Sequence, residues 1–306
     1  MPNLHDIERR INSVESTKKI TRTMQMVAAA KIRHATMRVD AATPFARAME
    51  ELLANIARMG GTNAPLTKDH DEVKTTLIVA IVSDRGLAGG FNSNVLRRAE
   101  RIMKDCKAEG KNVLIAACGK KAINYFKYRN IDTVLAFRDL SADPRVEEAQ
   151  ALADYAIENF LSGDLDEVVL LYNHAKNAGE QVMVEDRRLP VDLERFIPDG
   201  EEAFHAGAIT APDPDNPDLT GAIEYESDET VVLDKLLPEY LSGAFYYLLI
   251  DSAAAEQAAR RNAMKSATDN ANEMIETLNR LYNRVRQGAI TTEINEIVGG
   301  AAALED

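Results

Sequence analysis

The residues best placed to do chemistry form a glycine-rich run at positions 83–92, with the sequence SDRGLAGGFN. This run follows a short apolar segment, which is where an α/β protein commonly holds a phosphate group. Its glycine spacing, however, matches neither the GxGxxG of a dinucleotide site nor the GxxxxGK of a P-loop. Asp84 beside Arg85 would also put a carboxylate where the phosphate should bind. We therefore expect a structural turn with an exposed face and no bound cofactor. A cofactor-binding α/β enzyme is the alternative.

Other reactive side chains are scattered along the chain rather than grouped. The five histidines stand singly, with no HExxH pair of the kind that binds zinc. Cys106 and Cys118 lack CxxC spacing and nearby histidines, so we interpret them as buried thiols of a reducing compartment. Ser83 has no glycine elbow around it and no histidine in its motif. The sequence therefore predicts neither a metal site nor a catalytic residue.

A long helix is expected before this run, in the N-terminal part of the chain. From Asn3, which can cap a helix, to about residue 59, helix-forming residues dominate and the only proline is Pro44. Apolar residues three and four positions apart indicate a coiled-coil seam, which lapses at residues 16–19 and then resumes. The predicted helix ends at Gly60. The seam positions are Leu4, Ile7, Ile11, Val14, Ile20, Met24 and Val27.

A second seam marks a C-terminal helix, which we expect to run from Pro238, acceptable in a first turn, to about Gly299. Its three-four alternation slips at residues 287–289, and such a stutter changes the supercoil locally. We predict that the two helices form an antiparallel coiled coil, because the tether keeps them at high effective concentration. The alternative is that both pair with other copies of the chain. The seam positions are Met264, Ala267, Ala271, Met274, Leu278, Leu281 and Val285, followed by Ile290, Ile294 and Ile297.

Short apolar runs rich in Val, Ile and Leu lie between the two helices, as in strands buried on both faces. Helical segments alternate with these runs, and this order implies a parallel sheet. We therefore predict a Rossmann-like α/β domain with a mostly parallel sheet, flanked by the coiled coil, and an antiparallel edge strand at residues 181–185. The predicted strands are residues 76–82, 113–117, 133–137 and 168–172, and the predicted helices are residues 93–109, 120–129 and 145–161.

These patterns divide the chain into four segments. Residues 1–60 and 231–306 form the coiled-coil helices, residues 74–190 the α/β domain, and residues 191–230 an acidic, proline-containing loop.

Charge is distributed very unevenly along the chain. Residues 192–229 hold twelve acidic residues and one basic residue, and so carry most of the net charge of −13. The first 58 residues are mildly basic, which suits an acidic protein partner, and we expect no nucleic acid partner. No apolar run reaches the ~18 residues that would span a bilayer, so we expect no direct membrane insertion.

Three stretches, residues 7–32, 83–92 and 256–303, closely resemble the gamma subunits of F-type ATP synthases. The resemblance covers nearly the whole chain, and its two terminal signatures are highly specific. They read IERRINSVESTKKITRTMQMVAAAKI and EQAARRNAMKSATDNANEMIETLNRLYNRVRQGAITTEINEIVGGAAA. The chain departs from the family pattern at Ala88, often cysteine, at Ala254, often serine, and in a longer acidic region. The resemblance therefore implies the family fold and leaves the acidic region without an assigned role.

The resemblance implies a non-catalytic rotor shaft. The paired helices would stand inside the ring of alpha and beta subunits, while the α/β domain would join the epsilon subunit and the membrane c-ring. Proton flow would turn the c-ring and this shaft with it, coupling rotation to ATP synthesis or hydrolysis. The implied location is peripheral, on the cytoplasmic face of the bacterial inner membrane, and an inhibitory protein could be a further partner. A coiled-coil scaffold or adaptor with an α/β interaction domain is the alternative.

The family's contact residues carry over onto both helices. Arginine forks and short polar groups can bind a partner loop and release it, because exposed ion pairs contribute only about 0 to 1 kcal/mol. The contacts implied with beta subunits are Lys19, Arg22, Met24, Arg260, Arg286, Gln287, Thr291, Glu293 and Glu296. The implied apolar bearing tip is Ile290, Ile294, Ile297 and Val298, and the implied foot loop is Asp84, Arg85 and Gly86.

Overall fold

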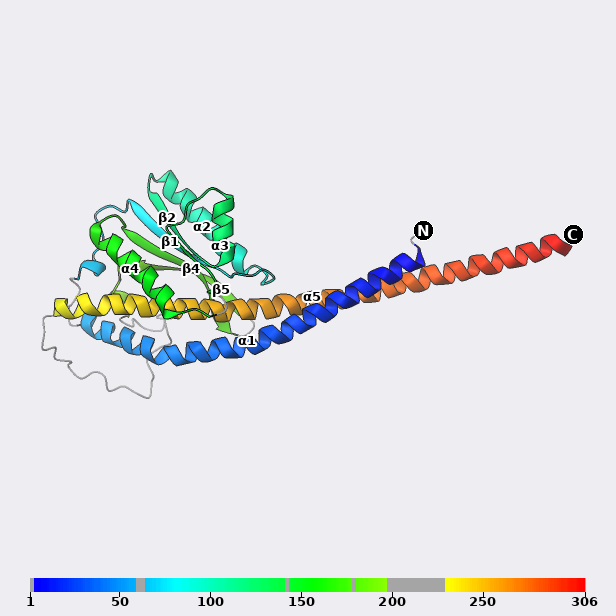
Figure 1. The fold of residues 1–306 in the computed structure, drawn as a ribbon, viewed down its shortest axis with the longest axis horizontal. Helices are drawn as coiled ribbons and strands as arrows, with labels where there is room; N and C mark the ends of the chain where they lie inside the picture. The colour runs from blue at the N-terminus through cyan, green and yellow to red at the C-terminus, as the bar shows by residue number, and fades with distance from the viewer. Residues whose placement is uncertain (1–2, 59–63, 141–142, 178–179, 197–228, 306) are drawn as a thin grey trace. The chain divides into compact units, whose positions relative to one another are not determined.

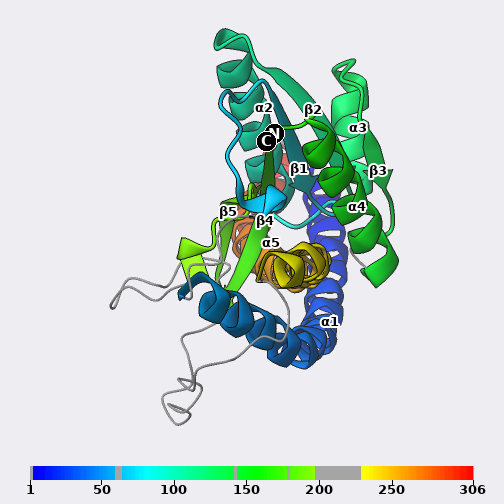
Figure 2. The ribbon, with the colours of Figure 1, turned by 90° about the vertical axis from the view of Figure 1, so that its left-hand side faces the viewer.

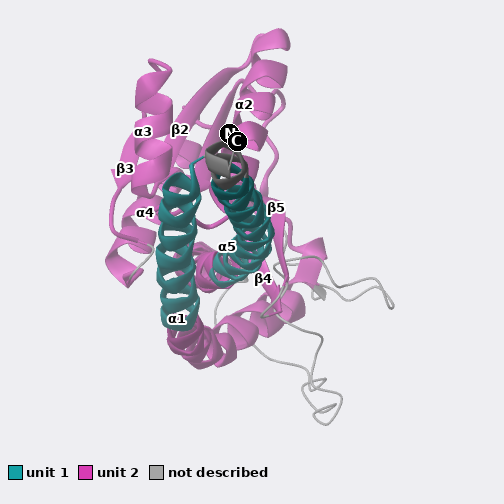
Figure 3. Ribbon diagram, turned by 90° about the vertical axis from the view of Figure 1, so that its right-hand side faces the viewer, with its two compact units in different colours: residues 1–28, 261–306 teal, residues 29–260 magenta. Residues whose placement is uncertain are grey.

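The structure is a computed structural model of the chain. The contacts within it divide the chain into two compact units, which are coloured separately in Figure 3. The smaller unit comprises residues 1–28 and 261–306, and the larger one, the α/β unit, comprises residues 29–260. Most of the acidic stretch lies outside the residues that the structure describes. The described residues are 3–58, 64–140, 143–177, 180–196 and 229–305. Within these ranges, no helix has both the length and the apolar character needed to cross a membrane.

Two long helices begin and end the chain, as the sequence predicts. Helix α1 covers Leu4–Arg58 and helix α5 covers Glu229–Glu305 (Figure 1). Asn3 caps α1, because its Oδ1 accepts the backbone N–H of His5 at 3.2 Å. Pro44 lies inside α1 without ending it.

The C-terminal helix is longer than predicted at both ends. It begins at Glu229, so Pro238 lies inside it rather than in its first turn, and it continues past Gly299 to Glu305. Burial of apolar side chains on both sides of the proline offsets the roughly 3 kcal/mol that an interior proline costs a helix. The buried stripe consists of Leu233, Leu237, Leu241, Phe245 and Leu249.

A five-stranded sheet lies between the two long helices in sequence, with the strand order β3-β2-β1-β4-β5. Strands β1 to β4 are parallel, and β5 pairs antiparallel with β4. This arrangement confirms the predicted mostly parallel sheet with an antiparallel edge. The strands are β1 (Thr75–Ile81), β2 (Asn112–Cys118), β3 (Leu135–Phe137), β4 (Glu167–Asn177) and β5 (Glu180–Leu189).

Helices cover both faces of this sheet, which explains why its central strands are apolar throughout (Figure 2). On β1, Leu77 and Val79 join one buried cluster with α4 and parts of α1 and α5. Ile78 and Ala80 point to the opposite face and join a second cluster with α2 and α3. The shorter helices are α2 (Phe91–Ala108), α3 (Lys120–Tyr128) and α4 (Val146–Ser162).

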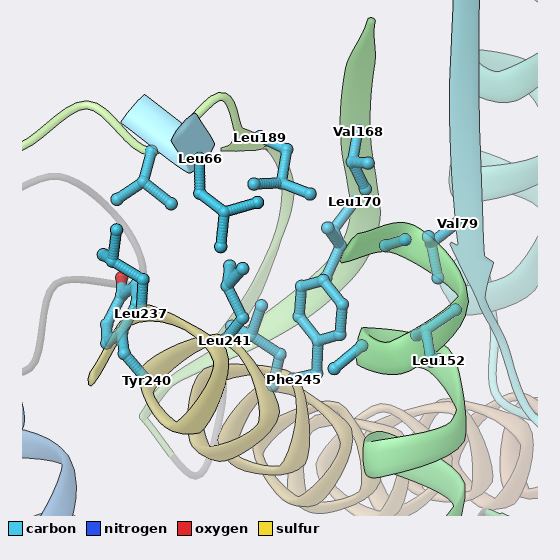
Figure 4. Close-up of a cluster of buried hydrophobic side chains, with 14 of the residues drawn as sticks. Leu66, Val79, Leu152, Val168, Leu170, Leu189, Leu237, Tyr240, Leu241 and Phe245 are labelled. Atoms are coloured by element: carbon cyan, nitrogen blue, oxygen red, sulfur yellow. The ribbon is translucent and has the colours of Figure 1, made fainter. Parts of the chain in front are cut away.

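The first part of α5 belongs to the core of the α/β unit (Figure 4). Leu237, Leu241 and Phe245 have no exposed surface, and they share a buried cluster with Leu170 and Leu189 of the sheet. Full burial of such side chains contributes about 1.5 to 3 kcal/mol each. This stretch of α5 therefore packs against the sheet and is not only one helix of a coiled coil.

In the smaller unit, the ends of α1 and α5 form an antiparallel pair. Thr21 Oγ1 lies 2.8 Å from Thr268 Oγ1 across the pair. Counting outwards from this contact along the two antiparallel helices places Leu4 opposite Val285. The predicted antiparallel pairing of the terminal helices within one chain is confirmed in this unit.

The buried positions of α1 follow one another at steps of three and four residues from Leu4 to Ala28. The predicted lapse of the seam at residues 16–19 is therefore wrong, because Lys18 continues it. Ile20 and Val27, expected in the seam, are 61% and 51% exposed, and Met274 of α5 is 54% exposed. Several polar residues occupy seam positions instead. The buried or half-buried positions in the pair include Leu4, Ile7, Ile11, Val14, Lys18, Thr21, Met24, Gln25 and Ala28 of α1, with Met264, Ala267, Thr268, Ala271, Ile275, Leu278, Leu281, Tyr282 and Val285 of α5.

Helix geometry decides the seam here more than side-chain type does. Steps of three and four residues keep one stripe of each helix facing its partner, whatever side chains stand on it. The hydroxyls of Thr21 and Thr268 satisfy each other across the seam. The alkyl stem of Lys18 can cover apolar surface while its ammonium group reaches water. Apolar side chains outside the stripe therefore lie on the outer surface of the pair.

Replacing Ile7 with alanine should destabilise the pair by about 2 kcal/mol or more, as buried large-to-small changes do, because Ile7 is only 2% exposed. The same substitution at the exposed Ile20 should change stability by no more than about 0.5 kcal/mol. Hydrogen exchange of the α1 amides in the intact chain measures both effects. If both variants lost protection from hydrogen exchange equally, Ile20 would be shown to pack in the seam after all.

Candidate functional site

The glycine-rich loop between β1 and α2 is closed by its own side chains. Oδ1 of Asp84 accepts the backbone N–H of Lys120 at 2.9 Å and that of Asp139 at 3.0 Å. Oδ1 of Asn92 accepts both the N–H and the hydroxyl of Ser83 at 2.9 Å. Lys120 is the first residue of α3, and a helix N-terminus is where such a fold binds an anion. The carboxylate of Asp84 takes that position.

A close approach of two loops fixes this arrangement. Gly119 precedes α3 with a φ of 97°, and a Cβ atom at this position would lie 2.1 Å from the carbonyl oxygen of Val82. Glycine is therefore required here. The backbone N–H of Lys121 also donates to the carbonyl of Ser83 at 3.2 Å. The geometry agrees with the predicted structural turn. Elsewhere in the described part of the chain, no group of three or more His, Cys, Asp and Glu side chains could hold a metal ion.

Helix α5 packs on this loop through small side chains. Ala88 and Phe91 form a buried cluster with Ala255 and Ala259 of α5. The side-chain amide of Asn173 in β4 donates to the carbonyl of Phe91 at 3.0 Å. Because alanine is short, the helix backbone can lie close to the loop. The loop is thus a docking platform for α5 within the α/β unit.

Arg260 belongs to this internal contact rather than to the outer surface. Its guanidinium donates to Oε1 of Glu256 at 2.5 Å and to the carbonyl of Gly86 at 3.3 Å. The side chains of Arg260 and Glu256 are 11% and 2% exposed. A carboxylate as buried as that of Glu256 needs a close cation, because desolvation otherwise penalises its charge. The resemblance grouped Arg260 with surface contacts, but its described bonds are all within the α/β unit.

A second charged pair holds α5 on the end of β4. His174 Nδ1 lies 2.8 Å from Oδ2 of Asp251, whose side chain is 4% exposed. The hydrogen bond that His174 donates to the Asp251 carboxylate raises the pKa of His174, while partial burial acts in the opposite direction. The resulting stabilisation is fully present below the ordinary histidine pKa of about 6.5. It is lost as the pH rises through the raised pKa.

Deeper in the same unit, a buried ionic cluster joins β5, α5 and α1. The guanidinium of Arg188, 4% exposed, forms an ion pair with Asp186 and donates to the hydroxyl of Tyr240 at 2.7 Å. Burial raises the pKa of Glu50 in α1 to about 7, against the lowering effect of Arg188 and Arg195. Sequence reasoning missed this cluster, because charged residues near the end of an edge strand are usually exposed.

The remaining contact residues implied by the resemblance lie on the helix pair. In α1, Lys19 and Arg22 are exposed and Met24 is half-buried. In α5, the residues after Val285 continue past the start of α1 and have no seam partner among the residues that the structure describes. The exposed positions here include Arg286, Gln287, Thr291, Glu293 and Glu296.

An apolar tip extends along this same end of α5. Ile290, Ile294, Ile297 and Val298 are 46%, 53%, 71% and 62% exposed. Isolated exposed apolar side chains are ordinary, whereas several close together on one helix mark a surface that contacts another molecule. The structure therefore brings the tip together, on one helix end, with the five α5 residues for which the resemblance implies contacts.

The foot loop divides into buried and exposed parts. Asp84 and Gly86 bond to groups within the α/β unit, whereas Arg85 is exposed. Leu87 beside it is 63% exposed and has a positive φ of 66°. The side chains of Arg85 and Leu87 are therefore open to a partner.

Known proteins resemble this chain over nearly its whole length. A model of the ATP synthase family matches residues 3–304. The ATP synthase gamma chain of Leptospira biflexa is 38% identical over 300 residues, covering 98% of each chain. That of Ruminococcus albus is 40% identical over 306 residues, covering 100% of this chain and 99% of the relative. Among solved structures, the rotor of Euglena gracilis mitochondrial ATP synthase has the same fold, with a TM-score of 0.63, 18% identity and coverage of 94% of this chain and 98% of that chain.

Two arginines of α5 should respond differently to the same substitution. Arg260→Ala should lower the free energy of unfolding by about 3 kcal/mol, because it removes one partner of a buried ion pair. Arg286→Ala should change it by no more than about 0.5 kcal/mol, as at surface sites generally. Urea unfolding of the intact chain, followed by circular dichroism, measures both. Matching unfolding midpoints in the two variants would show that Arg260 is a surface residue after all.

Proposed function

Because the chain belongs to the ATP synthase gamma chain family, we propose that it is the rotating central shaft of an F-type ATP synthase. In this proposal the helix pair turns inside a ring of alpha and beta subunits. The α/β unit joins an epsilon subunit and the membrane c-ring, whose proton-driven rotation turns the shaft. The chain performs no chemistry itself and is peripheral, on the cytoplasmic face of the bacterial inner membrane.

The observation that supports this proposal most strongly is the unpaired end of α5. Past Val285 the helix has no seam partner in the described part of the chain, yet it exposes the apolar side chains of Ile290, Ile294 and Ile297. Apolar side chains on a helix surrounded by water contribute no stabilisation, whereas the same side chains are buried if other protein subunits enclose the helix. The apolar tip therefore suits a bearing, in which contacts are non-directional and permit rotation.

Polar residues next to the tip would supply the coupling. Arg286, Gln287 and Thr291 are exposed on the same helix end, where they can meet beta subunits in turn. An asymmetric shaft gives each beta subunit different contacts at each angle. It can shift a subunit between open and closed states only by the difference in contact free energy between those states. Exposed ionic contacts contribute only about 0 to 1 kcal/mol each, so they can also be released.

Helix α5 provides the path for torque. It is continuous over Glu229–Glu305, and its first part is buried in the α/β unit through the stripe that includes Leu241 and Phe245. The contacts of Asp251, Glu256 and Arg260 with the sheet end and the loop oppose slippage of the helix. A turn applied to the α/β unit is therefore carried into the helix pair along the unbroken backbone of α5.

The isolated chain should neither bind nor hydrolyse ATP. Its glycine-rich loop has no lysine for the phosphates, and Asp84 occupies the N-terminus of α3. Isothermal titration with ATP and magnesium should give no heat of binding, and hydrolysis should appear only after alpha and beta subunits are added. Micromolar affinity for ATP would contradict this expectation and favour a nucleotide-binding protein.

Replacing Arg286 and Gln287 together with alanine should impair coupling without unfolding the chain. Both are exposed, and alanine keeps helix propensity high. Coupling energies of about 1 to 3 kcal/mol correspond to roughly 5- to 150-fold effects, so proton-driven ATP synthesis in membrane vesicles should fall within that range. ATP-driven proton pumping in the same vesicles should fall as well.

A matched control replaces Glu276 and Arg280 with alanine, two exposed residues of α5 within the paired region. This variant should retain both activities, and both variants should melt near the temperature of the unaltered chain. Unaltered synthesis and pumping in the Arg286 and Gln287 variant would remove these residues from the proposed contacts. A large fall in its melting temperature would show that they are packing residues.

A further inference from the structure

Positive charge is concentrated on the outer side of α2 and α3, and the proposed function assigns no role to it. Residues 91–129 hold ten Lys or Arg and three Asp or Glu, a net charge of +7 in a chain whose total is −13. Six of these cations are exposed and form no ion pair with any described residue. They are Arg97, Arg101, Lys104, Lys107, Lys121 and Lys127, and we refer to them as the basic surface.

The six cations lie on one layer of the α/β unit. Helices α2 and α3 cover the same face of the sheet, as the cluster of Val95, Ala122 and Phe126 shows. An ion pair between Glu100 and Arg129 joins the two helices directly. The outward-facing cations of α2 and α3 therefore form neighbouring parts of one surface.

Nearby acidic groups do not neutralise this surface, because most of them have other partners. Glu100 pairs with Arg129, Glu109 with Lys111, and Glu185 of β5 with Arg98. Asp139 pairs with Lys120 at the start of α3. Asp105 is the only acid of residues 91–129 outside these ion pairs. Cations left in excess in this way attract an external anionic partner.

An exposed aromatic side chain adjoins the basic surface. Tyr128, the last residue of α3, is 84% exposed and stands between Lys127 and Arg129. The guanidinium of Arg129 lies over the ring of Tyr125, 3.7 Å from its centre, so it does not cover Tyr128. A tyrosine flanked by cations suits the boundary between water and lipid, where an apolar ring with a polar end is favourable.

We propose that the basic surface and Tyr128 bind the anionic phospholipid headgroups of a membrane. The cations are spread along two helices, which suits an extended anionic surface better than a single phosphate group or a short acidic peptide. Each Lys or Arg near such a surface strengthens binding by a factor of about five. The inference rests on the proposed function only in that the synthase brings this chain close to a membrane.

The test uses the intact chain and sedimentation with lipid vesicles. Binding should be seen with vesicles of mixed phosphatidylcholine and phosphatidylglycerol, but not with phosphatidylcholine alone, and added salt should weaken it. The variant R97Q/R101Q/K104Q should bind the anionic vesicles on the order of 100-fold more weakly. Tyr128→Ser should weaken binding by a smaller factor that persists at high salt, because the ring contributes apolar contact.

A control variant loses the same charge elsewhere. Lys31, Arg33 and Lys235 are exposed and lie outside α2 and α3, so K31Q/R33Q/K235Q should bind the anionic vesicles as the unaltered chain does. Circular dichroism should show all variants folded. Equal affinity for neutral and anionic vesicles, or equal loss in the two triple variants, would overturn the proposal.

Assembly with partner subunits separates this inference from the proposed function. The R97Q/R101Q/K104Q variant should still support ATP hydrolysis when combined with alpha and beta subunits, because its substitutions lie on α2. Unchanged vesicle binding together with weakened assembly would assign the basic surface to an acidic protein partner and refute the lipid proposal. If the unaltered chain did not act as a rotor with alpha and beta subunits, the proposed function would be refuted, whereas its binding to anionic vesicles would still support the lipid proposal.

Discussion

Burial of the first part of α5 in the α/β unit is the constraint on which the rest of the structure depends. A helix can carry torque only if one end cannot turn on its own, and the hydrophobic stripe through Leu241 and Phe245 prevents such turning. The bonds of Arg260 and Asp251 add directional contacts that a purely apolar interface lacks. The glycine-rich loop is thereby a docking platform, which explains how a fold often used to hold nucleotides can serve a mechanical purpose.

The helix pair combines a modest seam with an apolar outer surface. Thr21 and Thr268 are hydrogen-bonded where two apolar side chains would otherwise meet, and a polar pair in a seam specifies register at some cost in stability. Ile20, Val27 and Met274 point outwards instead. Such a pair leaves apolar contact area on its outer surface, which the proposed ring of partner subunits would bury.

Most of the fold could be predicted from the sequence, because its signals are local and periodic. The apolar runs of β1 and β4 and the three-four spacing from Leu4 to Val14 depend on near neighbours only. The seam phase beyond Val14 could not be predicted from hydrophobicity, because spacing placed Lys18 and Gln25 in the seam. Likewise, a surface arginine and the buried Arg260 look the same in sequence. Their difference lies in a contact with Gly86, 174 residues away in the chain.

The central claim is that the chain rotates as one body while its partners catalyse the reaction. The most direct measurement fixes an assembled ring of alpha and beta subunits to a surface and follows a probe attached to the exposed Lys176, replaced by cysteine, in the α/β unit. Added ATP should turn the probe in one direction, and the rotation should stop when ATP is removed. Sustained ATP hydrolysis with a stationary probe would contradict the claim, because the chain would then be a static scaffold rather than a shaft.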